Sequence, residues 1–206
     1  MPTTRVLLLR HAETSDPSVF HGAESDVGLS DRGRLQAERA ADALASLAPD
    51  SVVSSAMRRA VDTARVIAAR CGKELRTEPD LHERRVGTLS GKPRGTPDDP
   101  WPETLRRWQA GETDYAHPGA ESFDAMHRRL LPVWERLTAE HAGRTLVIVA
   151  HGIVCRVLLV SLLEGYGLAT WKGLGGILNV GIHELVREGD GPWRAVRLND
   201  LPPGVG

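Results

Sequence analysis

Two short stretches decide the fold of this chain: RVLLLRH at residues 5–11 and TLVIVAHG at residues 145–152. Each contains a continuous apolar run of strand length, residues 6–9 in the first and 146–150 in the second, and each has a histidine shortly after that run. Such runs are typical of strands buried on both faces, as in a parallel sheet covered by helices. If the two strands are parallel neighbours, their histidines meet at the carboxyl edge of the sheet, where open α/β sheets bind ligands. We therefore expect His11 and His151 to share a site.

Helix patterns alternate with strand patterns along the rest of the chain. The first helix is expected to begin at Ser30 as its N-cap and to run to about Leu47, with Leu35 and Leu44 on its apolar face. The other expected elements are strands at 51–53, 74–77, 177–186 and 193–198 and helices at 57–69, 103–109, 121–140 and 153–163. This alternation predicts one domain over residues 1–206, a three-layer α/β/α sandwich whose central sheet is mainly parallel. The last two strands are expected to form a hairpin that adds an antiparallel edge.

One segment, residues 87–120, concentrates glycine and proline and holds only a short helix pattern. A long irregular stretch in a compact domain is usually a functional loop. We therefore expect residues 87–120 to form a lid or substrate-binding segment over the site.

Composition excludes several classes of protein. The chain has 26 basic and 27 acidic side chains and only 4% aromatic residues, so nucleic acid and membrane surfaces are not expected partners. Its two cysteines and the lack of a long uninterrupted apolar segment favour the cytoplasm. No metal-binding motif is present, and neither a metal nor a cofactor is expected. The sequence leaves a homodimer open.

Arginines make up 23 of the 26 basic residues, and two of them have informative positions. Arg10 directly precedes His11 at the end of the first strand. Arg59 falls in the first turn of an expected helix, where a bound anion would offset its unfavourable charge. Arginine binds phosphate through two donors at once, so an anion site beside the histidines is expected.

Several short motifs recur in a characteristic order. They are RHAET at 10–14, LSDRG at 29–33 followed by QA at 36–37, SS at 54–55 with RA at 59–60 and TA at 63–64, LHE at 81–83, PGAES at 118–122 and HG at 151–152. In this order and spacing they resemble the motifs of the histidine phosphatase superfamily, over nearly the whole chain. The resemblance implies the phosphoglycerate mutase-like fold.

The resemblance also implies roles for the residues that match its motifs. His11 would be the nucleophile that forms a phosphohistidine. Glu83 would protonate the leaving oxygen and then activate water, with His151 as a third catalytic group. The residues implied to bind the phosphoryl oxygens are Arg10, Arg59, His151 and Gly152.

The identity of the acid and the substrate contacts are less sharply determined. Glu13 and Glu121 are alternatives to Glu83 as the general acid. Arg84 and Arg85 flank Glu83 and are candidates for binding a substrate carboxylate or second phosphate, although solvated surface arginines are an equal reading. Asn179 lies in a family-like stretch and is a further candidate for the site.

The expected activity is hydrolysis of a small phosphorylated metabolite without a metal ion. Residues 83–87 read ERRVG, which lacks the His and Tyr of the corresponding mutase stretch, and the segment 87–120 is short. A shorter lid favours a wetter site and therefore hydrolysis over phosphoryl retention. A cofactor-dependent phosphoglycerate mutase is the alternative, and a non-catalytic phosphate-binding domain is a third reading.

Overall fold

The computed structural model describes residues 2–205 and has a six-stranded sheet at its centre. The strands are β1 (Thr3–Arg10), β2 (Ser51–Ser55), β3 (Leu75–Glu78), β4 (Thr145–Ala150), β5 (Ile182–Glu188) and β6 (Arg194–Asp200), in the order β3-β2-β4-β1-β5-β6. The first four strands in this order pair in parallel, whereas β5 and β6 add an antiparallel edge. The predicted mainly parallel sheet with a terminal hairpin is confirmed.

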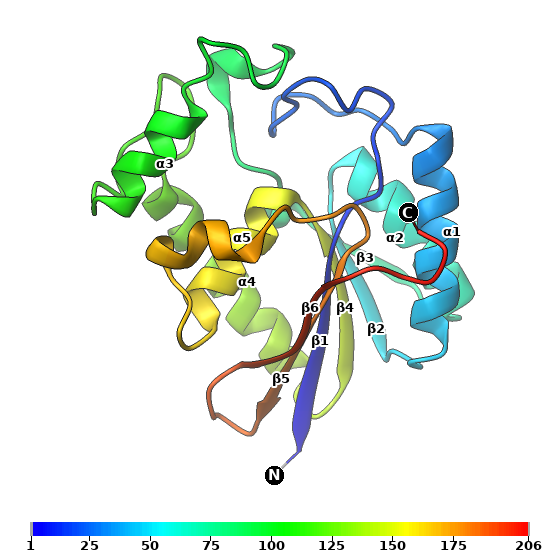
Figure 1. Cartoon of the computed structure of the whole chain (residues 1–206). Coiled ribbons are helices and arrows are strands. Elements are labelled where there is room, and N and C mark those ends of the chain that lie inside the picture. The colour runs from blue at the N-terminus through cyan, green and yellow to red at the C-terminus, as the bar shows by residue number, and fades with distance from the viewer. Residues whose placement is uncertain (1, 206) are drawn as a thin grey trace.

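Helices cover both faces of this sheet (Figure 1). On one side lie α1 (Asp31–Ala45) and α2 (Arg58–Arg70), and on the other lie α4 (Phe123–Glu140) and α5 (Gly152–Leu162). Alternate residues of β1 pack into two separate cores, Leu7 and Leu9 against α1 and α2, and Leu8 against α4 and α5. The remaining helices are α3 (Trp101–Gln109) and the short 3₁₀ turns η1 (Pro79–Leu81), η2 (Gly87–Leu89) and η3 (Leu168–Leu174). The predicted three-layer sandwich is confirmed.

The start of α1 follows the local sequence, but one residue of its predicted apolar face does not. The Ser30 hydroxyl accepts a hydrogen bond from the Gly33 N–H at 2.9 Å, which makes Ser30 the predicted N-cap. Leu35, however, is 65% exposed, so its placement on the packed face was wrong. The buried stripe runs through Gly33, Ala37 and Leu44, and Leu35 points away from it because one helical residue turns by about 100°.

The second correction concerns residues 177–181, which were predicted to belong to a strand. The strand β5 begins only at Ile182. The preceding residues instead fold across the carboxyl end of β1, where the Val180 N–H donates to the Arg10 carbonyl at 3.0 Å. Val180 has a φ of 51°, a left-handed conformation that strand backbone does not adopt. This turn brings Asn179 to the end of β1.

Two loops close over the carboxyl ends of β1 and β4, at the top of Figure 1. One is the loop between β1 and α1, and the other is the segment 87–120. They are joined where Phe20 N–H donates to the Lys92 carbonyl at 2.9 Å and Arg94 N–H donates to the Ser18 carbonyl at 3.0 Å. No helix within residues 2–205 has the length and apolar character needed to cross a bilayer.

Candidate active site

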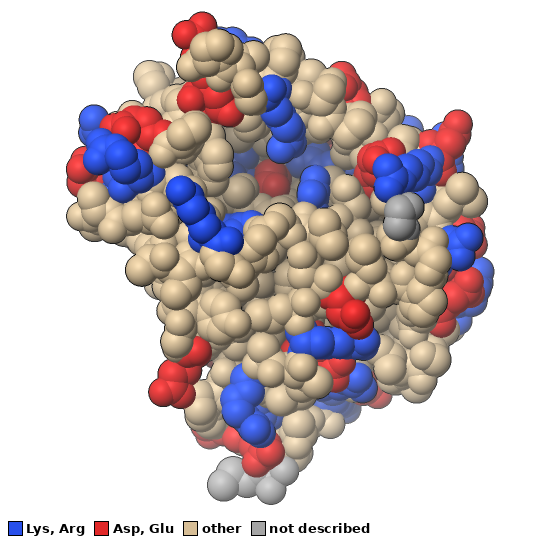
Figure 2. Space-filling model, viewed as in Figure 1, with Lys and Arg blue, Asp and Glu red and all other residues tan. Residues whose placement is uncertain are grey.

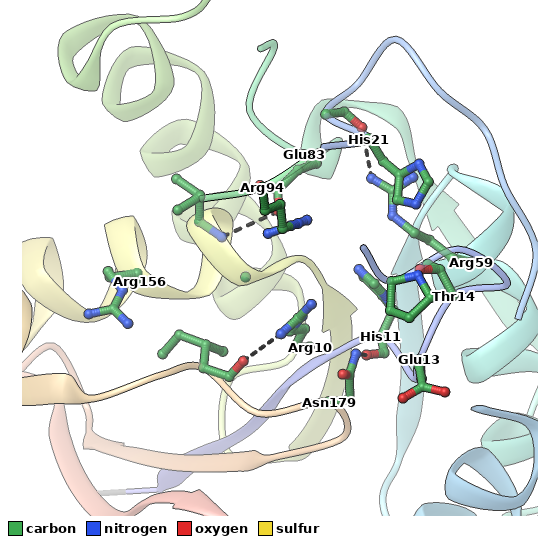
Figure 3. Close-up of a pocket in the computed structure, with 15 residues that line it drawn as sticks. Arg10, His11, Glu13, Thr14, His21, Arg59, Glu83, Arg94, Arg156 and Asn179 are labelled. Carbon is green, nitrogen blue, oxygen red and sulfur yellow. Dashed lines mark hydrogen bonds between the residues drawn. The ribbon is translucent and has the colours of Figure 1, made fainter. Parts of the chain in front are cut away.

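The predicted site residues come together because β1 and β4 are parallel neighbours in register. Arg10 is opposite Ala150, so His11 and His151 follow at the same edge, with ring centroids 5.2 Å apart. A cavity of about 190 Å³, here called the main cavity, opens beside His11 (Figure 3), and the buried His151 does not line it. The predicted residues that line it are Arg10, His11, Arg59, Glu83, Gly152 and Asn179.

His11 is held in one tautomer by the backbone. Its Nδ1 lies 2.7 Å from the Ala12 carbonyl oxygen, which can only accept, so Nδ1 carries the proton and Nε2 keeps its lone pair. Burial lowers the pKa of His11 well below its ordinary value, and the charges of Arg10 and Arg59 lower it further. The imidazole is therefore neutral at physiological pH. The Asn179 amide adds a hydrogen bond to the His11 carbonyl at 2.8 Å.

Arg59 projects from the first turn of α2 and is almost completely buried. Its Nη1 and Nη2 donate to the carbonyls of Ser25 and Gly22 at 2.9 and 2.8 Å. Burial lowers its pKa, but no ion pair neutralises it within residues 2–205. Its charge thus remains available to an anion in the main cavity, while the two carbonyls fix its position.

Arg10 supplies a second guanidinium from the end of β1. Its Nη1 donates to the Ile177 carbonyl at 2.7 Å, and its Nε is buried without a hydrogen-bond partner in the described part of the chain. Gly152, the first residue of α5, faces this side chain, since a Cβ added there would lie 3.6 Å from the Arg10 Nε. An unpaired buried donor is costly unless a ligand accepts from it.

His151 is fully buried behind this arrangement. Its Nε2 lies 2.8 Å from the Ser55 hydroxyl, and its Nδ1 has no hydrogen-bond partner among residues 2–205. Burial, followed by the charge of Arg59, lowers its pKa well below the ordinary histidine value. A neutral ring with an unpaired polar atom thus lies edge-on to His11.

Glu83 follows η1 in the chain, and its carboxylate lies beside the first turn of α5, across the cavity from His11 in Figure 3. One carboxylate oxygen accepts from the Arg84 N–H at 2.8 Å and the other from the Ile153 N–H at 3.4 Å. Of the alternatives, Glu121 pairs with Arg129 at 2.9 Å and lines no part of the main cavity. Glu13 lines it.

The Glu13 carboxylate already has two partners. It accepts from the Ser30 hydroxyl at 2.8 Å and pairs with Arg32 at 3.4 Å. Among residues 2–205 Glu83 has no side-chain partner of this kind, and the geometry therefore favours Glu83 as the acid.

The two arginines beside Glu83 have different surroundings. Arg84 is buried, with its guanidinium over the rings of Trp101 and Trp108 at 5.2 and 5.3 Å, and burial lowers its pKa to about 10. It lines a second cavity of about 260 Å³, here called the side cavity, together with Glu83. Arg85 is exposed and lines neither cavity, so the structure does not bring it to the site.

Among the residues that line the main cavity without having been predicted as site residues, three have nitrogen-bearing side chains that can carry positive charge: His21, Arg94 and Arg156. Arg156 carried a detectable signal, because it is a charge inside the apolar helix 153–163. Arg94 carried none, since it is one of several arginines in an irregular segment. Within residues 2–205, no group of three potential metal ligands is present.

A neutral histidine with a free Nε2, flanked by two uncompensated arginines and one carboxylate, is suited to accept a phosphoryl group. The fold and this arrangement define the class of the protein, an enzyme that transfers phosphoryl groups through a histidine.

Comparison with known proteins gives the family. Residues 6–201 match the family model of the histidine phosphatase superfamily (branch 1). The chain is 37% identical over 157 residues to phosphoglycerate mutase-like protein 4 of Arabidopsis thaliana, covering 74% of this chain and 68% of that protein. It is 34% identical over 187 residues to the glucosyl-3-phosphoglycerate phosphatase of Mycolicibacterium vanbaalenii, covering 87% and 82%. The solved structure of a mycobacterial glucosyl-3-phosphoglycerate phosphatase superposes with a TM-score of 0.83 at 30% identity, covering 96% of this chain and 99% of that one.

The chain belongs to the histidine phosphatase superfamily. Reaction through a phosphohistidine is typical of this family. A metal-independent phosphoserine phosphatase of Arabidopsis thaliana is a further relative, 31% identical over 196 residues, which cover 92% of this chain and 79% of that protein. The predicted family, fold class and phosphatase activity are confirmed.

Proposed function

We propose that this phosphatase hydrolyses a small phosphomonoester in two steps, with His11 as the nucleophile. The observation that carries the proposal is the tautomer of His11. With Nδ1 bonded to the Ala12 carbonyl at 2.7 Å, the lone pair on Nε2 is available for attack on phosphorus.

In the first step a P–N bond forms at Nε2 while the bond from phosphorus to the ester oxygen breaks. Glu83, in its protonated form, transfers its proton to the departing oxygen. The position of the Glu83 carboxylate on the main cavity, held by the N–H groups of Arg84 and Ile153, supports this role.

In the second step Glu83, now a carboxylate, takes a proton from water. The water oxygen attacks phosphorus and the P–N bond breaks. The electron pair of that bond returns to Nε2 of His11, and inorganic phosphate leaves. Arg10 and Arg59 stabilise the charge on the phosphoryl oxygens in both steps. The unpaired Arg10 Nε is a donor that such an oxygen would satisfy, and His151 Nδ1 is a second donor when its Nε2 accepts from the Ser55 hydroxyl.

Other parts of the molecule have supporting roles in this proposal. Residues 87–120 act as the lid and substrate segment of a single domain, because they carry Arg94 to the cavity. Asn179 positions the backbone of His11. The free thiols of Cys71 and Cys155 suit a reducing compartment, and the protein is proposed to act on a small phosphorylated metabolite in the cytoplasm.

The experiment is phosphate release from p-nitrophenyl phosphate and a panel that includes phosphoserine and glucosyl-3-phosphoglycerate, with a chelator present. His11→Ala should lower kcat by at least about 10³-fold, because the nucleophile is removed. Brief incubation with labelled substrate and denaturing quench should leave acid-labile, alkali-stable label on the wild-type protein and none on His11→Ala.

His127→Ala is the matched control, because His127 lines neither cavity. It should keep both turnover and label. Full turnover in His11→Ala would contradict the proposed mechanism. If the wild type instead interconverts 3- and 2-phosphoglycerate with stimulation by 2,3-bisphosphoglycerate and releases little phosphate, the mutase alternative holds.

A further inference from the structure

The side cavity adjoins the main cavity at the proposed acid. Residues that line both are His21, Gly22, Glu83, Arg94 and Ile153. In the proposed reaction Glu83 gives its proton to the ester oxygen, so that oxygen lies beside Glu83 and the rest of the alcohol extends beyond it. The phosphoryl group occupies the side of Glu83 that faces His11. The leaving group therefore extends into the side cavity.

The walls of the side cavity suggest what kind of group fits. Phe20, Val86 and Trp101 give it apolar and aromatic surface, which suits the carbon skeleton of the alcohol. The volume of about 260 Å³ accommodates a small metabolite. Figure 2 shows a hollow on this face of the molecule, with basic side chains around it and an acidic group inside it.

Arg94 is a free cation at the boundary between the two cavities. Its Nε donates to the Val19 carbonyl at 2.9 Å, while its Nη1 and Nη2 have no hydrogen-bond partner and no ion pair within residues 2–205. After burial and the charge of Glu83, the Arg94 charge is among the influences on the pKa of Arg10, which it lowers. In the proposed reaction Arg10 and Arg59 already bind the phosphoryl group, so the charge of Arg94 is available to bind a second anion.

The position of Arg94 is set before any substrate binds. Its N–H donates to the Ser18 carbonyl at 3.0 Å, and its guanidinium lies 5.0 Å from the centroid of the Phe20 ring. Together with the Val19 contact, these interactions tie the lid segment to the loop that follows His11. A cation that is already ordered loses little conformational entropy on binding.

We propose that the side cavity is the leaving-group subsite, and that Arg94 selects phosphomonoesters whose alcohol part carries a second anionic group, a carboxylate or a phosphate. This inference rests on the proposed function. The free Nη groups of Arg94 bind the second anion, while the aromatic wall contacts the carbon skeleton between the two charged ends.

The test compares kcat/KM for three esters built on the same three-carbon skeleton. Glycerol 3-phosphate has no second anion, 3-phosphoglycerate has a carboxylate, and glycerol 1,3-bisphosphate has a second phosphate. The wild type should prefer at least one of the two anionic esters to glycerol 3-phosphate by tenfold or more. Which of the two it prefers identifies the chemistry of the second anion.

Arg94→Gln should lower this selectivity ratio at least tenfold, because it removes a charge-assisted hydrogen bond to the leaving group. Arg94→Lys, which keeps the charge, should retain most of the ratio. Lys92→Gln is the control, since Lys92 is an exposed cation of the same segment that lines neither cavity. It should leave the ratio within threefold of the wild type.

Two results would overturn the inference. One is a wild type that turns over all three esters with similar kcat/KM. The other is an Arg94→Gln variant that loses activity equally on all three, which would mean that Arg94 acts on the phosphoryl group itself. Neither result contradicts the proposed function. Failure of the proposed function would instead appear as absent turnover or as absent label on His11.

Discussion

At the scale of single residues, the reactivity of this site depends on how the imidazole of His11 is held. A neutral histidine ring can carry its proton on either of two distinct nitrogens, and only the Nδ1–H tautomer leaves the Nε2 lone pair free toward the cavity. The Ala12 carbonyl makes the choice, and the Asn179 amide holds the peptide next to it. The motif at residues 10–14 supplies both the histidine and the Ala12 carbonyl that fixes its tautomer, whereas Arg59 and Asn179 reach it from distant parts of the chain.

We predict that the His11 ring stays neutral, with its proton on Nδ1, well below pH 6.5. Burial and the charges of Arg10 and Arg59 all disfavour the cation, so protonation requires a lower pH than for an ordinary histidine. Nitrogen-15 NMR of labelled protein measures both the tautomer and the titration of the ring. The His11 ring signals are assigned as those that are missing from the spectrum of His11→Ala. A midpoint near 6.5, or a proton on Nε2, would contradict the prediction.

We predict that Asn179→Ala and Asn179→Asp both lower kcat about three- to tenfold, with little change in thermal stability. Each removes the donor to the His11 carbonyl, a bond of about 1 kcal/mol, and the aspartate keeps the shape while losing the N–H. Steady-state kinetics on p-nitrophenyl phosphate measures the effect. Wild-type kcat in the aspartate variant would show that the donor has no part in positioning His11.

At the scale of elements, local patterns predicted most helices and strands because each packs one continuous face on the sheet. The β4 strand has the predicted bounds, and α1 has its predicted cap. The segment 177–181 was read wrongly because its apolar residues suit a strand, whereas its turn across β1 depends on partners far away in sequence. The same distant packing explains the glycine of the motif LSDRG at residues 29–33.

We predict that Gly33→Ala destabilises the protein by more than about 1 kcal/mol, against the usual gain from replacing glycine in a helix. A Cβ at Gly33 would overlap the backbone carbonyl of Glu13, two residues after His11. Urea unfolding measures the change in the free energy of unfolding, and kcat should fall with it. Gly173→Ala is the control, because a Cβ there meets no atom within 4 Å. Equal effects at both positions would argue against this packing.

At the scale of the whole molecule, the sheet collects charges and neutral histidines that are remote in sequence. Folding buries His11, His151 and His183 in their neutral forms. His183 lies on β5, outside the site, and its Nδ1 accepts from the Asn199 N–H at 3.1 Å. Burial, followed by the charge of Arg156, lowers its pKa to about 4. This histidine therefore links the stability of the fold to pH.

We predict that His183 contributes to acid destabilisation between pH 6.5 and 4. The unfolded chain takes up the proton at about 6.5 and the folded chain only at about 4, so the neutral ring costs no stability above pH 6.5, and the free energy of unfolding decreases as the pH falls through this window. The loss amounts to about 3 kcal/mol. Urea unfolding at several pH values should show that the free energy of unfolding depends less on pH in His183→Gln than in the wild type. Parallel profiles would rule this contribution out.

The sequence by itself determined the α/β sandwich and its family, and it predicted the residues that are proposed as the core of the site. Short local patterns predict the buried strands and the helix caps. They also predict the proposed site residues Arg10, His11, Arg59, Glu83 and His151. Only the tertiary structure decided which of the many other arginines matter. Arg94 and Arg156 reach the main cavity whereas Arg85 lines neither cavity. The physical reason is that a buried strand needs only its own apolar run, but a cavity is lined by side chains that loops bring together from distant parts of the chain.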